Sequence, residues 1–191
     1  MATISEVTIC NMALRELHAN PIANLSEGSL EASVCNLYYE LARNFVLVAA
    51  PWNFAIKRTD ILATTTAPKW DYQYAYTYPV DCLRLLSIND RDAGWRVELN
   101  ESDTKVIVTN LQKAKLKYIK EIKDTQQFSS SFIFAFAKFL KHLIATPLTG
   151  QREQSQAALQ EYQGFLQQAK TDDGQESSQV LFISTALTEV R

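Results

Sequence analysis

The sequence predicts an α+β fold, in which a core of about four helices carries an inserted small antiparallel β-sheet and an extended C-terminal tail. Apolar residues repeat with helical spacing at both ends of the chain, but with a period of two in the middle third. A proline, Pro51, marks the first change of period. We expect helices in residues 1–52 and 129–172, the β insertion in residues 53–128, and a linker with a docking tail in residues 173–191.

The first helix is predicted from a cap, an apolar stripe and a stop signal. Thr3 and Glu6 have the T-x-x-E spacing of a capping box. Asn20 and Pro21 are expected to end the helix. The stripe consists of Val7, Cys10, Leu14 and Leu17.

A second, longer helix is expected over residues 29–49, with Pro51 ending it. Its apolar stripe repeats at steps of three or four residues, so we expect this face to lie in the core. The stripe consists of Leu30, Val34, Leu37, Leu41, Phe45 and Val48.

The stretch "PWNFAIKR" is predicted to be the corner at which helix becomes sheet. Trp52 and Phe54 are two positions apart, so on a strand they would point to the same side and wedge the sheet against the helices or a neighbouring subunit. Lys57 and Arg58 are then expected to face solvent or a neighbour. An active-site lip would need convergent polar groups, which this stretch does not offer.

The middle of the chain alternates with a period of two. Tyr72, Tyr74, Tyr76 and Tyr78 are expected to share one face of a strand. Such a ladder could stack on bases or sugar rings, but no Arg or Lys is interleaved on that face, which favours packing against helices or another copy. Further short strands are predicted at residues 82–88, 95–99, 105–110 and 113–122.

Lys113, Lys115 and Lys117 form a basic stripe, because they alternate with Ala114, Leu116 and Tyr118 along the last of these strands. A solvated strand face is one interpretation. The other is a weakly cationic surface that faces a polyanion in a channel, if many copies surround one axis.

Two further helices are predicted after the sheet. Ser129, Ser130 and Ser131 are candidate N-caps of the first, and Pro147 and Gly150 are expected to end it. Its apolar residues lie almost all round, which indicates a central helix. The second follows in residues 151–170, with Ala158, Leu159, Tyr162, Leu166 and Ala169 inward.

The C-terminal end is predicted to dock on a partner. The segment "TDDGQESSQ" has the composition of a linker, and an isolated apolar patch follows it. Apolar segments after polar linkers commonly bind in a partner's groove. The patch consists of Val180, Leu181, Phe182 and Ile183.

Composition offers little support for catalysis, cofactors or metals. The net charge is -2, which argues against a sequence-specific DNA-binding protein. No phosphate-binding or nucleophile motif is present, and neither His18 nor His142 has a metal-ligand partner at helical spacing. We expect Cys10, Cys35 and Cys82 to be buried thiols. The N-terminus lacks the features of a signal peptide and no run is long enough for a membrane span, so a cytoplasmic origin without membrane binding is expected.

The order of these segments resembles the tail tubular protein A family, the head-to-tail adaptors of short-tailed bacteriophages. The resemblance covers nearly the whole chain and is carried by "PWNFA", by "YPVDCLR", and by "YI" followed by the D-x-x-x-F spacing of Asp124 and Phe128. The sequence departs from the family where an "FP" often follows the last strand, since it has "FSSSF" instead.

This resemblance implies a structural virion protein without established catalytic residues. It implies a ring of twelve copies between the portal and the tail nozzle, with double-stranded DNA passing through the channel. It also implies that the C-terminal segment reaches the portal.

Two other functions stay open at this point. The first is a glycan or peptidoglycan hydrolase carried in the tail, using carboxylates among Asp71, Asp81, Asp90 and Asp92. The second is a cytoplasmic helical adaptor unrelated to phage.

Overall fold

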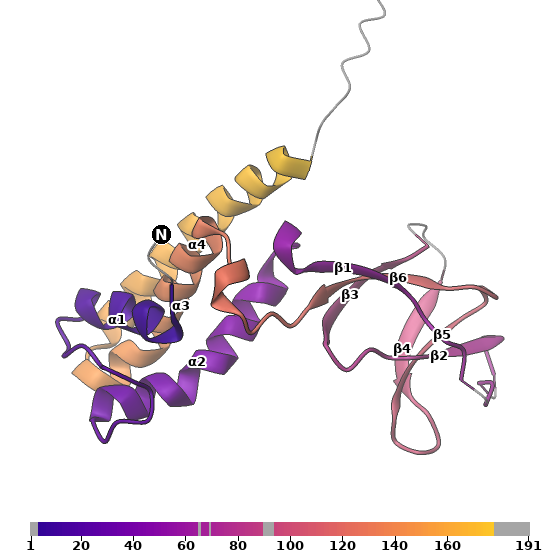
Figure 1. Cartoon of the computed structure of the whole chain (residues 1–191), viewed down its shortest axis with the longest axis horizontal. Helices are drawn as coiled ribbons and strands as arrows, with labels where there is room; N and C mark the ends of the chain where they lie inside the picture. Colours follow the sequence, from indigo (N-terminus) through magenta and orange to yellow (C-terminus); the bar gives the residue numbers. More distant parts are fainter. Residues whose placement is uncertain (1–3, 65, 69, 90–93, 178–191) are drawn as a thin grey trace, which may run out of the picture.

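A computed structural model describes residues 4–64, 66–68, 70–89 and 94–177, and it has the α+β fold that the sequence predicts. Two helices precede the strands and two follow them (Figure 1). The helices are α1 (Glu6–Glu16), α2 (Leu30–Ala49), α3 (Ser130–Thr149) and α4 (Arg152–Ser177). They form the helical module, in which α3 packs against each of the other three.

The insertion folds as two three-stranded antiparallel sheets, where the sequence suggested one. The first sheet has the order β1-β6-β3, with β1 at Ile56–Asp60, β6 at Lys115–Lys120 and β3 at Cys82–Ile88. The second has the order β2-β5-β4, with β2 at Tyr74–Thr77, β5 at Lys105–Thr109 and β4 at Trp95–Leu99. We call residues 56–120 the β-module.

The two sheets share one apolar core, which explains why the insertion divides. Tyr76 and Ile107 from the second sheet pack with Ile88, Leu116 and Tyr118 from the first, and all five are buried. A sheet that buries only one face can stabilise itself by packing on another such face.

The N-terminal cap of α1 differs from the predicted one. Ser5, not Thr3, is the N-cap, and its Oγ accepts a hydrogen bond from the backbone N–H of Thr8 at 3.1 Å. The Thr8 Oγ1 accepts from the backbone N–H of Ser5 in return, so the box closes with Thr8 and not with Glu6. The helix also ends earlier than predicted, at Glu16, where His18 adopts a left-handed conformation with φ 57°.

The ends of α3 are close to the predicted ones. Ser129 is the N-cap, and its side chain accepts a hydrogen bond from the N–H of Phe132. Pro147 does not end the helix but lies within its last turn, whereas Gly150 ends it in the left-handed conformation, with φ 71°. α3 is long and apolar enough to cross a membrane, but more than half of it is buried inside the protein, as expected of a central core helix.

α4 is longer than predicted. The sequence suggested a linker from residue 173, yet the backbone stays helical through Ser177 (Figure 1). The residues expected to point inward do so in part, since Ala158, Tyr162 and Ala169 are buried while Leu159 and Leu166 are half-buried.

Candidate assembly surfaces

The most prominent surface feature is an apolar stripe along α2, on the face that the sequence assigned to the core. Leu30, Leu37, Leu41 and Phe45 are 62%, 64%, 64% and 55% exposed. The assignment is therefore wrong for these four residues, whereas Val34 and Val48 of the same predicted stripe are half-buried and Val34 packs against the core. The opposite face of α2 is buried instead, through Ala32, Cys35, Tyr39, Ala42, Val46 and Leu47.

The composition of the two faces explains the outcome. The buried face contains two alanines and a cysteine, whose small side chains let the axis of α2 approach α3 closely. The exposed face keeps the bulkier leucines. Because both faces of α2 are apolar, periodicity alone could not tell which one packs inside the subunit.

The α2 stripe extends about 22 Å, as fifteen residues of helix separate Leu30 from Phe45. Phe45 stacks almost flat on Phe139 of α3, with ring centroids 4.3 Å apart and planes 6° apart. An exposed apolar surface of this length is a candidate interaction site.

A second apolar surface lies on α3 and α4, and we call it the α3–α4 patch. Phe134 and Phe165 are 49% and 39% exposed, and their rings stack at a centroid distance of 6.2 Å. They border a hollow of about 180 Å³ whose remaining lining is Ser130, Ser131, Gln168 and Ala169. In Figure 1, α2 runs along the lower side of the helical module and α4 along its upper side.

The corner residues Trp52 and Phe54 pack within the subunit. They do not lie on a strand as predicted, because Asn53–Ala55 form a 3-10 turn and β1 begins only at Ile56. Trp52 is 1% exposed, donates from Nε1 to the carbonyl of Val46 at 2.8 Å, and meets Phe132 edge-on. Phe54 contacts the same ring at 5.2 Å. The corner therefore anchors the β-module to α3.

The four tyrosines do not share one face. β2 begins only at Tyr74, and Tyr74, Tyr76 and Tyr78 pack on the core between the two sheets. Tyr72 packs on the other face of the second sheet, because Asp71 has a left-handed conformation with φ 68° just before it. Tyr76 is 2% exposed and donates a hydrogen bond to the carbonyl of Leu111, so it is a core residue and offers no stacking surface.

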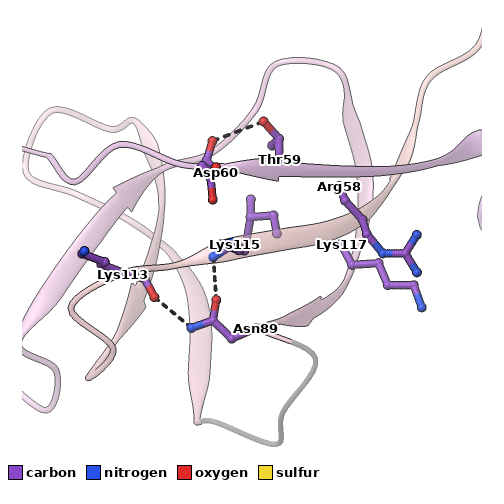
Figure 2. A pocket seen from close by; sticks show the side chains of 8 residues that line it. Arg58, Thr59, Asp60, Asn89, Lys113, Lys115 and Lys117 are labelled. Carbon is purple, nitrogen blue, oxygen red and sulfur yellow. Dashed lines mark hydrogen bonds between the residues drawn. The ribbon is translucent and has the colours of Figure 1, made fainter.

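The basic stripe lines a groove on the outer face of the first sheet (Figure 2). Lys113 and Lys115 are exposed and Lys117 is half-buried, whereas Ala114 and Leu116 between them and Tyr118 after them are buried. Lys113 precedes β6, and its carbonyl accepts from the amide of Asn89, whose Oδ1 accepts from the N–H of Lys115. The groove has a volume of about 530 Å³ and is lined by Arg58, Thr59, Asp60, Asn89, Lys113, Lys115, Leu116 and Lys117.

Sequence reasoning missed the contribution of β1 to this groove. Arg58 lies directly opposite Lys117 in the β1–β6 pairing, and Asp60 lies opposite Lys115. The register of two strands that are more than fifty residues apart cannot be derived from their periodicity. One signal could have placed Arg58 on this face. Arg58 lies two positions after Ile56, so both side chains lie on the same face of the strand, and Ile56 pairs with the buried Ile119 of β6.

Of the carboxylates considered for hydrolysis, the structure describes Asp71 and Asp81, and Asp81 is hydrogen-bonded to two other side chains. Asp81 accepts a hydrogen bond from the Tyr118 hydroxyl at 2.8 Å and from Lys57 Nζ at 3.1 Å. Burial acts to raise the pKa of Asp81, but these two hydrogen bonds outweigh it and hold the pKa below its ordinary value. Asp71 occupies the strained turn before Tyr72, and Asp90 and Asp92 lie outside the described residues. Lys57 is exposed to solvent, as expected, and its ammonium group also forms an ion pair with Asp81.

The histidines and cysteines have structural contacts. His142 Nδ1 lies 2.9 Å from the Ser155 Oγ, which connects α3 with α4. Cys10 and Cys35 are fully buried where α1 meets α2, and Cys82 is half-buried. Within the described ranges, no group of three His, Cys, Asp or Glu side chains is placed to hold a metal ion.

A cluster of four charged side chains joins three helices and was not foreseen. Lys138 Nζ of α3 lies 2.7 Å from Glu16 of α1 and 2.7 Å from Glu161 of α4. Lys141 contacts the same two carboxylates at 2.9 and 3.5 Å. Burial acts to raise the pKa of Glu16, but hydrogen bonds from both lysines lower it overall, and the hydrogen bond from Lys138 lowers the pKa of Glu161.

The candidate docking residues Val180, Leu181, Phe182 and Ile183 lie outside the described residues. Comparison of the sequence with known protein families and with curated proteins finds no match.

Proposed function

We propose that this protein is a structural virion subunit that assembles into a ring at the junction between a phage portal and its tail nozzle. Two lines of reasoning support the proposal. The order of segments along the chain resembles the tail tubular protein A family, and the subunit exposes apolar surface suited to assembly. Double-stranded DNA would pass through the ring without being read, and the twelve copies are inferred from the resemblance alone.

The observation that carries the proposal is the α2 stripe. Four large apolar side chains with at least half of their surface in water follow one helix face. Burying the exposed area of each side chain in an interface would contribute about 1 kcal/mol or more to the free energy of association. This is the expected driving force for homo-oligomerisation.

The presence of two separate apolar surfaces favours a ring over a dimer. A two-fold dimer uses the same patch on both copies, whereas a cyclic ring joins one patch to a different patch on the next copy. The α2 stripe and the α3–α4 patch lie on different helices of the same module. We therefore pair the α2 stripe of one subunit with the α3–α4 patch of its neighbour.

Mass photometry and negative-stain microscopy of the purified protein test the proposal. The wild-type chain should form closed rings, and Leu37→Glu/Leu41→Glu should leave monomers, because the two introduced charges at each interface cannot be buried unpaired. Leu62→Glu is the matched control, since Leu62 is 82% exposed but lies in the β-module. A protein that stays monomeric at its highest attainable concentration, or rings that survive the double substitution, would contradict the proposal.

Mixing two defective variants tests the pairing itself. Phe134→Glu/Phe165→Glu blocks the α3–α4 patch and leaves the α2 stripe intact. Combined with Leu37→Glu/Leu41→Glu, it should form one-to-one dimers that cannot grow, although each variant alone is monomeric. If Phe134→Glu/Phe165→Glu dimerises alone, the α2 stripe pairs with itself and the ring pairing is wrong.

A further inference from the structure

We propose that the groove on the outer face of the first sheet, with Arg58, Lys115 and Lys117 among its four cationic side chains, binds the phosphate backbone of duplex DNA without reading its sequence. The proposal deepens the proposed function and rests on it for the choice of DNA as the polyanion. The binding chemistry itself follows from the groove.

The groove gathers cations that the subunit does not neutralise. Four of its eight lining residues are Arg or Lys, and Asp60 is the only carboxylate in that lining. Among the described residues, none of these four cations forms an ion pair within 4 Å. Other lysines of the described chain do pair with carboxylates, as Lys57, Lys138 and Lys141 do.

Arg58 and Lys117 are the two cations best placed to bind one anion together. They are directly opposite in the antiparallel pairing, and Figure 2 shows their side chains extending side by side in the same direction. Like charges in opposite positions on a sheet destabilise it. A phosphate between the guanidinium and the ammonium group would convert this repulsion into two charge-assisted hydrogen bonds.

The spacing of the cations suits a chain of phosphates. Lys115 and Lys117 lie two positions apart on β6, so they are about 6.7 Å apart along the strand. Arg58 adds a second row on β1, one strand spacing away. Lysines on flexible stems neutralise phosphates as point charges, which is contact that positions a duplex and carries no base information.

The lining favours a duplex over a single strand. Proteins that bind single strands stack bases on aromatic side chains, and the lining of this groove contains none. The nearby Tyr118 is fully buried under the sheet, with its hydroxyl bonded to Asp81. Contact with the outside of a double helix needs no such platform.

A matched pair of variants tests the inference by fluorescence anisotropy with a labelled duplex of random sequence, over a range of low salt concentrations. Arg58→Gln/Lys115→Gln/Lys117→Gln should weaken binding by about tenfold or more, and should reduce the slope of log K against log salt by about 2 to 3 per bound subunit. Arg15→Gln/Arg152→Gln/Lys170→Gln removes the same charge from exposed positions on the helical module and should change affinity by less than about twofold.

Three outcomes would overturn the inference: equal loss in both triple variants, no binding of the wild-type chain, or equally tight binding of polyglutamate. Equal loss would mean that only net charge matters, and polyglutamate binding would indicate an acidic protein partner. In the wild-type chain, DNA should protect Lys115 and Lys117 from acetylation relative to Lys170, as measured by mass spectrometry. Repeating the assay with monomeric Leu37→Glu/Leu41→Glu keeps the two proposals apart, because its groove is intact whether or not rings form.

Discussion

Trp52 connects the end of α2 to the rest of the core through a single indole, which is 1% exposed and hydrogen-bonded to the carbonyl of Val46. Trp52→Ala should lower the free energy of unfolding by about 3 to 5 kcal/mol, because it leaves a large cavity beside Phe132 and removes a buried hydrogen bond. Urea unfolding followed by circular dichroism measures this change.

Trp70→Ala serves as its matched control, since Trp70 is 75% exposed and its removal should shift stability by no more than about 0.5 kcal/mol. An equal loss of unfolding free energy in the two variants would show that the indole of Trp52 does not stabilise the junction between α2 and the β-module.

The charged cluster of Glu16, Glu161, Lys138 and Lys141 gives a pH dependence of defined sign. The two lysines lower the pKa of both carboxyl groups below the ordinary value of 4.5, so the folded state binds protons less readily than the unfolded state. Their stabilisation is present above pH 4.5 and is lost as the pH falls through the folded-state pKa values.

Thermal unfolding between pH 6 and pH 3 tests this dependence. Glu16→Gln/Glu161→Gln should be less stable than the wild-type chain at pH 6, and should lose less further stability on acidification. Glu98→Gln is the control, because it removes an exposed carboxylate on strand β4 that is not part of the cluster. Its acid profile shows the effect of losing a negative charge alone. Parallel acid profiles for the wild-type chain and the double variant would refute the role of the cluster.

At the scale of single elements, two glycines of neighbouring segments should respond oppositely to the same substitution. Gly150 ends α3 with φ 71°, where a side chain is strained, so Gly150→Ala should destabilise the protein by about 1 kcal/mol. Gly164 lies inside α4 with nothing within 4 Å of the added carbon, so Gly164→Ala should stabilise the monomer by about 0.5 to 1 kcal/mol. Changes of the same sign, measured by thermal unfolding, would contradict this assignment.

The elements also show what sequence periodicity can and cannot supply. The bounds of α2 and the strand segments were predictable, because caps such as Ser29 and prolines such as Pro51 act locally. The inward face of α2 was not, since both of its faces are apolar and the choice depends on how closely α3 approaches. The same holds for the groove, in which Arg58 and Lys117 meet only through strand register. The sequence therefore identified only some of the residues that make up the candidate surfaces.

At the scale of the whole molecule, the length of α4 determines where the C-terminal tail can be cut. Because the helix continues through Ser177, a truncation after Ser177 should leave the unfolding temperature within about 1 °C of the full chain, since it keeps every helix and strand in the described part of the chain. We predict that this truncation abolishes binding to the portal, measured by sedimentation of the two purified proteins. Normal portal binding without residues 178–191 would refute the docking role of Val180–Ile183.

The aromatic cluster at the corner has a consequence for how the chain can be rearranged. Phe54 and Phe128 lie 5.9 Å apart between ring centroids, and both contact Phe132. The β-module thus leaves and re-enters the helical module at one point, which is the geometry of an inserted domain. Closing that point with a short loop would cost little entropy, and the main strand contacts that a replacement must restore are those of Ile119, Leu83 and Leu86 with the helical core. The sheets could thus diverge, and with them the proposed DNA-binding groove, while the helical surfaces proposed to form the ring stay the same.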